Sequence, residues 1–261
     1  MRPPDFPDER VLMPYAASTF SAGRVLVFSP HPDDEVFGCG GALADLVERG
    51  ARVDVVLVTD GAAGATSEED RERIASERRA ESRRALEALG GGAVHAGGIP
   101  DRAAGDRLSE VEDLLARWLV EVTPDLVFAP SPVETHPDHR AVAAALFRVA
   151  ARDVPDAAVR ALGAASVAFF ELSQPFRPNF LVDITRTRAR KERAMDAFVS
   201  QTALRDYAGF VAGLGAYRRM TLSSDVLAAE AYSVVEGSRL RSDAAGVVRG
   251  LLPLAPAITG G

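Results

Sequence analysis

Cysteine and lysine are nearly absent from this chain: among 261 residues, Cys39 and Lys191 are the only ones of their kind. A single thiol excludes an internal disulfide framework and any zinc finger built on cysteines. Arginine supplies the other basic residues, a bias that we attribute to codon usage in a GC-rich genome and not to function.

Long hydrophobic runs are also missing. No stretch reaches the about 18 uninterrupted apolar residues that a membrane-spanning helix needs, so we expect no membrane span. Residues 1–10 contain three prolines and three acidic residues without an apolar core, unlike a secretory signal peptide. The sequence therefore predicts a cytoplasmic protein.

Basic charge is not in excess, because 30 Lys and Arg stand against 37 Asp and Glu and leave a net charge of −7. A mildly acidic protein is a poor candidate for binding nucleic acid or anionic membranes. The apolar share of 47% and the charged share of 26% are those of a folded protein. The length favours one domain over residues 1–261, with residues 1–22 as a proline-rich lead.

Short apolar runs alternate with helical patterns along the chain. The runs at 24–29, 52–58, 125–129 and 166–170 are typical of buried parallel strands. We expect helices at about 40–48, 67–89, 109–122 and 141–151, the third opened by a capping box of Ser109 and Glu112. This alternation predicts the α/β class, as a Rossmann-like, mostly parallel sheet with helices on both faces. Such a sheet binds ligands beyond the carboxyl ends of its strands.

The glycine-rich motif of dinucleotide-binding sheets is missing after the first strand. The residues there are His31-Pro-Asp-Asp-Glu35, and the glycines follow later in a different spacing. This disfavours a dinucleotide-binding oxidoreductase. An imidazole beside adjacent carboxylates is costly to hold without a cation, and a divalent metal would neutralise the cluster.

A second such segment, His136-Pro-Asp-His139, follows the run at 125–129, and the two segments hold three of the four histidines. One segment alone is equally well explained as a hydrogen-bonding loop. Two segments at the ends of two strands of one parallel sheet favour a metal site. His95 and Cys39 stand apart and are interpreted as structural residues.

The two segments together resemble the signature pair of the PIG-L/LmbE family of zinc-dependent N-acetylglucosamine deacetylases. Weaker blocks of that family extend the resemblance over most of the chain: 78–81, 89–90, 98–101, 182–183, Lys191, 200–201 and 229–232. The resemblance implies a bound metal, either Zn²⁺ or Fe²⁺. It also implies a small-molecule N-acetyl amino-sugar conjugate as the partner, and it leaves the oligomeric state open.

Carried over position by position, the resemblance implies that His31, Asp34 and His139 bind the metal. Two nitrogens and one oxygen leave a coordination position for water, as in catalytic zinc sites. Asp33 then matches the general base and His136 its electrostatic partner. Asp138 matches an acid that orients or tunes His136.

The resemblance also implies substrate contacts. Arg78 and Asp101 match positions that bind the sugar, although an ion pair of Arg78 with Glu77 or Glu81 on its own helix is the plainer alternative. Glu134 stands where some sugar deacetylases of the family carry tyrosine. We expect its carboxylate at the rim of the pocket, where it would disfavour strongly anionic substrates.

The chemistry predicted for these groups is hydrolysis of an acetamide to acetate and a free amine. Zinc lowers the pKa of bound water to about 7, a carboxylate accepts the proton, and protonated His136 holds the oxyanion. Two other functions stay open: an amidase of a larger acyl or thiol conjugate, and a catalytically silent sugar- or metal-binding module. The acid that is released distinguishes the first, and the intact Asp33 argues against the second.

Overall fold

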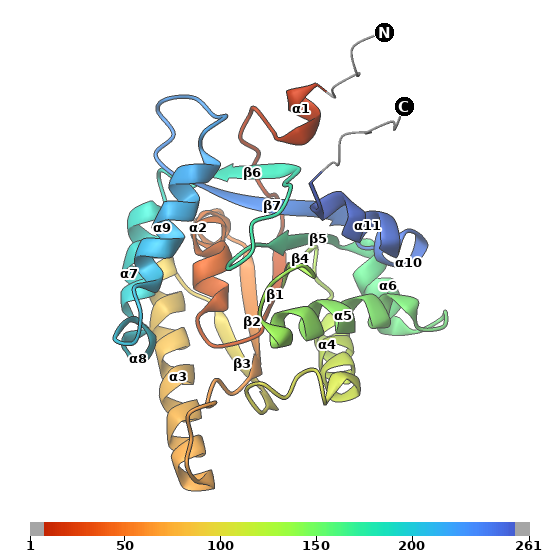
Figure 1. Ribbon diagram of the computed structural model, residues 1–261. Helices are drawn as coiled ribbons and strands as arrows, with labels where there is room; N and C mark the ends of the chain where they lie inside the picture. The colour runs from red at the N-terminus through yellow and green to blue at the C-terminus, as the bar shows by residue number, and fades with distance from the viewer. Residues whose placement is uncertain (1–7, 254–261) are drawn as a thin grey trace, which may run out of the picture.

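The computed structural model describes residues 8–253, and these form one seven-stranded sheet in the order β3-β2-β1-β4-β5-β7-β6 (Figure 1). The strands are β1 (Arg24–Ser29), β2 (Arg52–Thr59), β3 (Ala93–Ile99), β4 (Leu126–Pro130), β5 (Ser166–Phe170), β6 (Phe180–Asp183) and β7 (Ala229–Glu236). The first five are parallel, whereas β7 runs antiparallel to both β5 and β6. The predicted Rossmann-like, mostly parallel sheet is confirmed.

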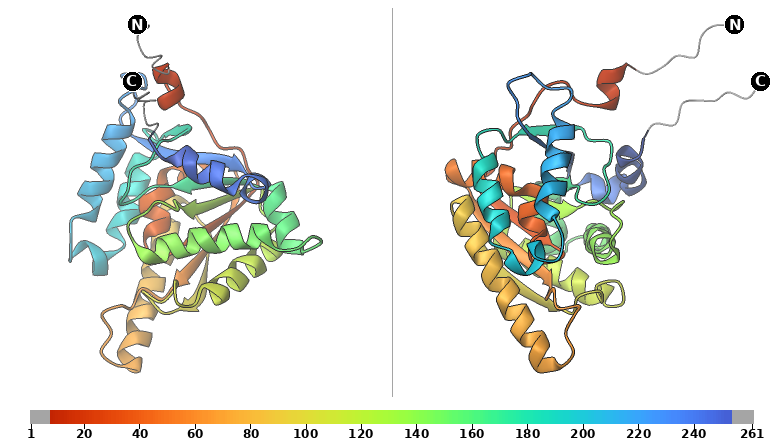
Figure 2. Two further views of the ribbon diagram at one scale, coloured as in Figure 1. Left: turned by 45° about the vertical axis from the view of Figure 1, so that its right-hand side comes forward. Right: turned by 60° about the vertical axis from the view of Figure 1, so that its left-hand side comes forward.

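Helices cover both faces of this sheet (Figure 2). One face packs against α2 (Asp34–Glu48), α3 (Glu68–Leu89) and α7 (Arg188–Asp196). The other packs against α4 (Leu108–Val122), α5 (Pro137–Ala151), α6 (Ala157–Ala164), α10 (Arg239–Ser242) and α11 (Ala244–Leu251). The remaining helices of the described range are α1 (Glu9–Leu12), α8 (Val199–Thr202) and α9 (Tyr207–Arg218). Within residues 8–253, no helix has both the length and the apolarity that a membrane crossing requires.

The alternation of side chains along the central strands builds a separate apolar core on each face. In β1, Leu26 and Phe28 join the core under α4 and α5, whereas Val25 and Val27 join the core under α2 and α3. All four side chains are fully buried. Because both faces of β1 are covered, its sequence is a continuous apolar run, as expected for a central parallel strand.

Some helix boundaries differ from the sequence predictions. The capping box is wrong, since α4 begins at Leu108, and Glu112 accepts hydrogen bonds from Arg148 and Arg152 of α5 and its C-cap. The helix expected from about residue 40 begins at Asp34 and has a break at Cys39, where φ is −140° and ψ is 15°. The part after the break matches the prediction, and the additional first turn carries the acidic pair.

Close packing against β5 explains one of the glycines of α2. A Cβ atom on Gly38 would overlap Cδ2 of Phe170, a ring that is fully buried. We therefore expect Gly38→Ala to lower the free energy of unfolding by about 1–3 kcal/mol, as overpacked cores do. Urea denaturation measures this loss. Gly163→Ala in α6, where nothing lies within 4 Å of the added atom, is the control and should not destabilise; an equal loss in both would contradict the packing argument.

The winding of the chain brings the two histidine segments together. From β1 the chain proceeds outward through β2 to β3 and then returns to β4 on the other side of β1. The carboxyl ends of β1 and β4 therefore form the point where the strand order reverses, which is where such sheets bind ligands. His31 follows β1 and His136 follows β4 at this point.

Candidate metal and catalytic site

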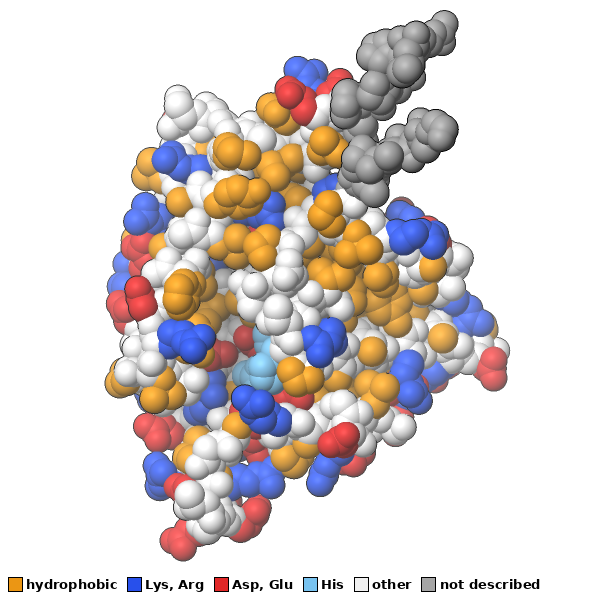
Figure 3. All heavy atoms as spheres, viewed as in Figure 1, with side chains coloured by type: hydrophobic (Ala, Val, Ile, Leu, Met, Phe, Trp, Pro, Cys, Tyr) orange, Lys and Arg blue, Asp and Glu red, His pale blue; other side chains and the backbone are white. Residues whose placement is uncertain are grey.

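A pocket of about 650 Å³ opens at the carboxyl ends of β1 and β4. Seven of the nine residues singled out from the sequence line it: His31, Asp33, Asp34, Arg78, Asp101, His136 and His139. Figure 3 shows the histidine surface in a hollow on this face, with acidic atoms beside it and arginines around it. The other two residues, Glu134 and Asp138, are fully or almost fully buried and lie behind the lining, next to His139 and His31.

Three atoms in the pocket form a nearly equilateral triangle. Asp34 Oδ2 lies 3.1 Å from His31 Nδ1 and 3.1 Å from His139 Nε2, and the two nitrogens are 3.2 Å apart. Ligand atoms on a tetrahedral zinc ion at 2.0–2.1 Å are separated by about 3.3 Å. The residues present therefore fit one divalent ion with two nitrogen ligands and one oxygen ligand.

Acidic neighbours favour positive charge at His31. Burial disfavours its imidazolium form, but hydrogen bonds with Asp101, Asp138 and Asp34 raise the pKa well above the usual value of histidine. Burial likewise opposes ionisation of Asp34, yet His139 and His31 lower the pKa of that carboxyl. Surroundings that stabilise a proton in this way are equally suited to a divalent cation.

Asp33 lies beside the triangle but makes a different contact. Its Oδ2 accepts a hydrogen bond of 2.8 Å from Arg78 Nη2. Its φ of 136° falls in the region that favours glycine, so the backbone is strained there. Burial and the charge of Asp34 raise the pKa of Asp33, against the lowering effect of Arg78. A buried carboxylate with a raised pKa is suited to accepting a proton.

Arg78 extends from α3 into the loop that follows β1. Its Nη2 donates to the carbonyl of Pro32 and to Asp33 Oδ2. Glu77 pairs with another arginine of α3, and Glu81 accepts hydrogen bonds from the start of α8. The alternative ion pair of Arg78 along its own helix is therefore wrong, and the guanidinium holds the strained loop instead.

His136 is the N-cap residue of α5. Its Nδ1 accepts a hydrogen bond of 3.2 Å from the backbone N–H of Asp138, so a neutral ring carries its proton on Nε2. Burial and the charges of His31 and His139 lower the pKa of His136. The expectation of a protonated His136 disagrees with these surroundings, but the neutral ring still offers an N–H donor.

The Asp138 carboxylate contacts a different histidine from the one expected. Its Oδ2 lies 3.1 Å from His31 Nε2, and its oxygens accept the N–H groups of Arg102 and Ala104. Its backbone N–H donates to His136 Nδ1. A carboxylate behind a ligand histidine fixes the tautomer and orientation of the ring. The expectation that Asp138 orients or tunes His136 stays a prediction: its backbone N–H bonds to that ring and its negative charge raises the pKa of His136, while the same carboxylate also contacts His31.

Glu134 lies in the wall of the pocket and not at its rim. Its side chain is 1% exposed, and its oxygens accept the successive N–H groups of residues 172–173. Its Oε2 is 3.9 Å from His139 Nδ1. The exposed charged residues in the lining include Arg102 and Arg205. The expectation that Glu134 repels anionic substrates is wrong, since its charge is buried among donors.

Sequence reasoning missed the residues that close the far side of the pocket. These are Gln201, Arg205, Tyr207, Phe210 and Val211, from α8, α9 and the turn between them. The weak block at 200–201 was their only sequence signal. Glu35 was also missed: it is fully buried, and its Oε2 accepts from the N–H of Asp33 and the hydroxyl of Ser29. Its place as the last acid of the first segment could have identified it.

Comparison with known proteins identifies relatives of this chain. The family model described as PIG-L, GlcNAc-PI de-N-acetylase, matches residues 26–150. Diacetylchitobiose deacetylase from Thermococcus kodakarensis is 30% identical over 187 residues, which cover 68% of this chain and 70% of that protein. The 4-oxalmesaconate hydratase of Pseudomonas putida is 29% identical over 218 residues, which cover 76% of this chain and 83% of that protein.

A solved structure shares the fold. N,N′-diacetylchitobiose deacetylase from Pyrococcus horikoshii matches with a TM-score of 0.70 and 27% identity, over 84% of this chain and 86% of that one. The PIG-L match begins in β1 and ends in α5, and so contains both histidine segments. With a 30% identical relative covered over more than two thirds of its length, this chain belongs to the PIG-L family.

Proposed function

We propose that this protein is a metal-dependent hydrolase that removes the acetyl group from an N-acetylglucosamine-type amino-sugar conjugate. The observation that carries the proposal is the triangle of Asp34 Oδ2, His31 Nδ1 and His139 Nε2, with the Asp33 carboxylate beside it. Ligands alone would suit a binding module, whereas an additional buried carboxylate that is held apart from the triangle suits catalysis. The diacetylchitobiose deacetylase relatives support the choice of reaction.

The metal is Zn²⁺ in this proposal, with Fe²⁺ as the alternative, and His31, Asp34 and His139 hold it. When bound, a divalent ion supplies Lewis acidity, which makes water nucleophilic near neutral pH and polarises an amide carbonyl. Asp138 keeps His31 in place through its contact with Nε2. Glu134 stands behind His139 in the same manner, at a longer distance.

Asp33 and His136 carry out the proton transfer and the stabilisation of charge. The Asp33 carboxylate accepts a proton from water as the water oxygen forms a bond to the acetamide carbon. As the carbon–nitrogen bond breaks, the same carboxyl returns the proton to the amine nitrogen, so acetate and a free amine leave. His136 donates from Nε2 to the oxygen of the acetamide while negative charge develops there. Arg78 keeps Asp33 in the strained conformation that faces the water.

Polar and aromatic groups around this centre suit a sugar conjugate. Asp101 faces the pocket, and Gln201 and Tyr207 stand in the opposite wall. We propose Asp101 as an acceptor for sugar hydroxyls. Because Arg102 and Arg205 carry positive charge, the proposed substrates include conjugates with an acidic aglycone as well as neutral ones.

A second candidate function is hydration of an unsaturated carboxylic acid. Two observations favour it: the similarity to the Pseudomonas putida hydratase and the exposed Arg102 and Arg205 in the pocket lining, which would attract carboxylates. We rank it second, because the triangle and Asp33 also account for amide hydrolysis and the family model describes a de-N-acetylase.

The test is acetate release by the Zn²⁺-loaded protein. Neutral N-acetylglucosaminides with a second sugar or inositol, and an acidic conjugate with malate, are supplied as substrates. We expect acetate and free amine in equal amounts, and loss of both after removal of the metal by a chelator. An unsaturated dicarboxylic acid serves as the hydratase probe. Loss of its conjugated absorbance without acetate release from any sugar would overturn the proposal.

His136→Ala separates charge stabilisation from metal binding. We expect kcat to fall by about 10²–10³-fold, the usual cost of losing one donor to a developing oxyanion, while metal content is unchanged. His136→Gln, which retains a side-chain N–H donor, should recover part of the loss. Acetate release and elemental analysis measure both quantities. An unaltered kcat in His136→Ala would remove this residue from the mechanism.

A further inference from the structure

Lys191 and Glu230 form a buried ion pair that the mechanism above does not use. Their side chains are 6% and 4% exposed, and Lys191 Nζ lies 2.7 Å from Glu230 Oε1. The pair stands in the wall of a pocket of about 370 Å³ between α7, α9 and β7, next to the catalytic pocket. Both residues lie in the weaker sequence blocks that received no role.

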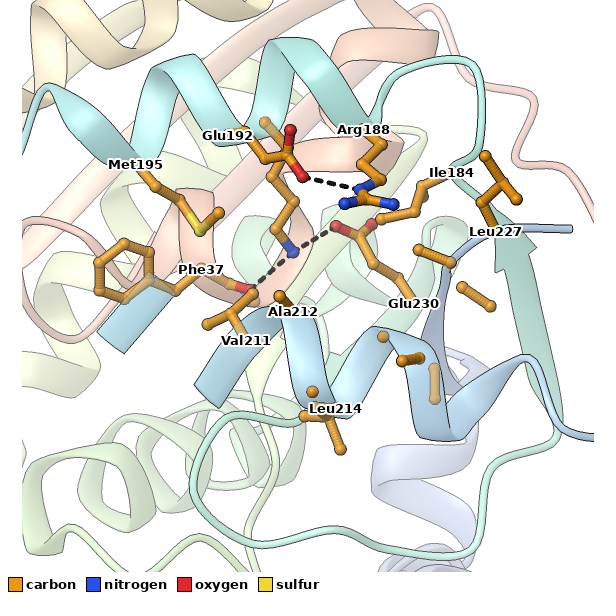
Figure 4. A pocket seen from close by; sticks show the side chains of 18 of the residues that line it. Phe37, Ile184, Arg188, Glu192, Met195, Val211, Ala212, Leu214, Leu227 and Glu230 are labelled. Carbon is orange, nitrogen blue, oxygen red and sulfur yellow. Dashed lines mark hydrogen bonds and ion pairs between the residues drawn. The ribbon is translucent and has the colours of Figure 1, made fainter. Parts of the chain in front are cut away.

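The ion pair lies at the break in α2. In an unbroken helix the N–H of Gly41 would donate to the carbonyl of Phe37. Here the carbonyl of Phe37 accepts a hydrogen bond of 2.8 Å from Lys191 Nζ, and the N–H of Gly41 donates to Glu230 Oε1 at 2.8 Å. Figure 4 shows the two bonds of the lysine nitrogen as dashed lines, one to Glu230 and one to the Phe37 carbonyl. Each charge thus bonds to one of the two backbone groups that pair with each other in an unbroken helix.

Both carboxylate oxygens of Glu230 accept hydrogen bonds in this arrangement. Besides Gly41 and Lys191, its oxygens accept the N–H of Ala42 at 2.8 Å and the hydroxyl of Tyr232 at 2.7 Å. Glu230 places a negative charge at the start of the second part of α2, and Lys191 places a positive charge at the end of the first turn. Both charges complement the helix dipole. Close packing explains the glycine at position 41, because a Cβ there would lie 2.5 Å from Ile184 Cγ2 and 2.9 Å from Glu230 Oε1.

The turn before the break, residues 34–38, is too short to be stable by itself. It carries Asp34, the oxygen corner of the triangle, and it follows directly on Asp33. Its direction therefore depends on contacts outside the helix, which include the packing of Val36 and Phe37 in the core. They also include the bond from Lys191 at its end and the loop bonded to Glu35 at its start.

We infer that Lys191 and Glu230 are positioning residues, which act through the break in α2 to hold Asp34 at the distance from His31 and His139 that a divalent ion requires. The inference rests on the metal site of the proposed function. Stability alone is a weak explanation for the pair, since neutral residues of similar size often replace a buried ion pair without loss of stability. Orientation of the first turn, in contrast, needs a donor for the carbonyl and an acceptor for the N–H groups.

The double variant K191M/E230Q tests this inference, because it removes both charges and leaves neither one unpaired. The matched control is R218M/E171Q. Arg218 and Glu171 form an equally buried ion pair, 2% and 3% exposed, that makes no hydrogen bond to α2. The readout is the dissociation constant for Zn²⁺ alone, measured by competition with a chromogenic chelator, together with thermal unfolding of the metal-free chains.

We expect the dissociation constant of K191M/E230Q to rise about tenfold or more, as for loss of groups that orient metal ligands. The single variant E230Q, which retains the ammonium group, should fall between the double variant and the wild type. R218M/E171Q should bind Zn²⁺ like the wild type even if it unfolds at a lower temperature. The Co²⁺ absorption spectrum of K191M/E230Q should also differ from that of the wild type, because the geometry of the ligands changes.

Unchanged Zn²⁺ affinity in a folded K191M/E230Q or E230Q would overturn the inference, and so would an equal loss in the control pair. A wild-type chain that binds no divalent ion would overturn both the inference and the proposed metal site. If K191M/E230Q loses Zn²⁺ affinity while the wild type releases no acetate from any substrate, the positioning role stands and the proposed reaction falls.

Discussion

His139→Ala should leave the protein folded but without its metal and without acetate release. The substitution removes one corner of the triangle and leaves Asp34 Oδ2 with one imidazole nitrogen, His31 Nδ1, at 3.1 Å. Two protein ligands hold a divalent ion far less tightly than three. We expect metal content to fall to near zero after dialysis, and activity to fall by more than the about 10²–10³-fold that a lost oxyanion donor costs.

Elemental analysis and acetate release measure the two effects of His139→Ala. The control is His95→Ala, which removes the one histidine outside the pocket. His95 bonds to Asp54 on β2, so its loss should leave metal content and activity at the wild-type level. Full metal occupancy in His139→Ala would show that His139 is not a ligand.

Asp33→Asn should retain the metal and lose most of the activity. Asparagine has the same shape as the aspartate that it replaces, so it adds no backbone strain, and its side-chain oxygen can still accept the hydrogen bond from Arg78. The amide cannot accept a proton from water, so we expect kcat to fall by about 10²–10⁴-fold, the usual contribution of a general base. Metal content near one ion per chain, together with the lower kcat, is the expected pair of results.

Asp34→Asn is the matched comparison for Asp33→Asn, since the two acids are neighbours and both are buried. We expect Asp34→Asn to weaken metal binding, because it replaces the charged corner of the triangle by a neutral amide. If instead Asp33→Asn loses the metal and Asp34→Asn retains it, the roles of the two acids have been assigned the wrong way round.

The sequence predicted four of the five parallel strands, β1, β2, β4 and β5, because both faces of those strands are buried. Leu26 and Val27 point to opposite cores, so their strand is apolar throughout and easy to detect. Strand β3 was missed because it is an edge strand whose side chains are mostly half-buried or exposed. Strands β6 and β7 pair antiparallel at the other edge, and their pairing comes from long-range contacts that no local pattern reports.

The residues of the candidate site could be found from the sequence, but not all of their contacts. Spacing along the chain brings Asp138 close to His136, only two residues away, whereas the fold turns its carboxylate to His31, 107 residues away. The first turn of α2 was missed for a similar reason. Its conformation depends on Lys191 and Glu230, which lie more than 150 residues further along the chain.

Glu134 connects the wall of the pocket with the candidate metal site. Its carboxylate holds the loop at 172–173, which lines the pocket, and stands behind His139. A change in that loop would also alter the support of His139. We therefore expect a change in the backbone conformation of residues 172–173 to weaken metal binding at the proposed site as well as to reshape the wall of the pocket.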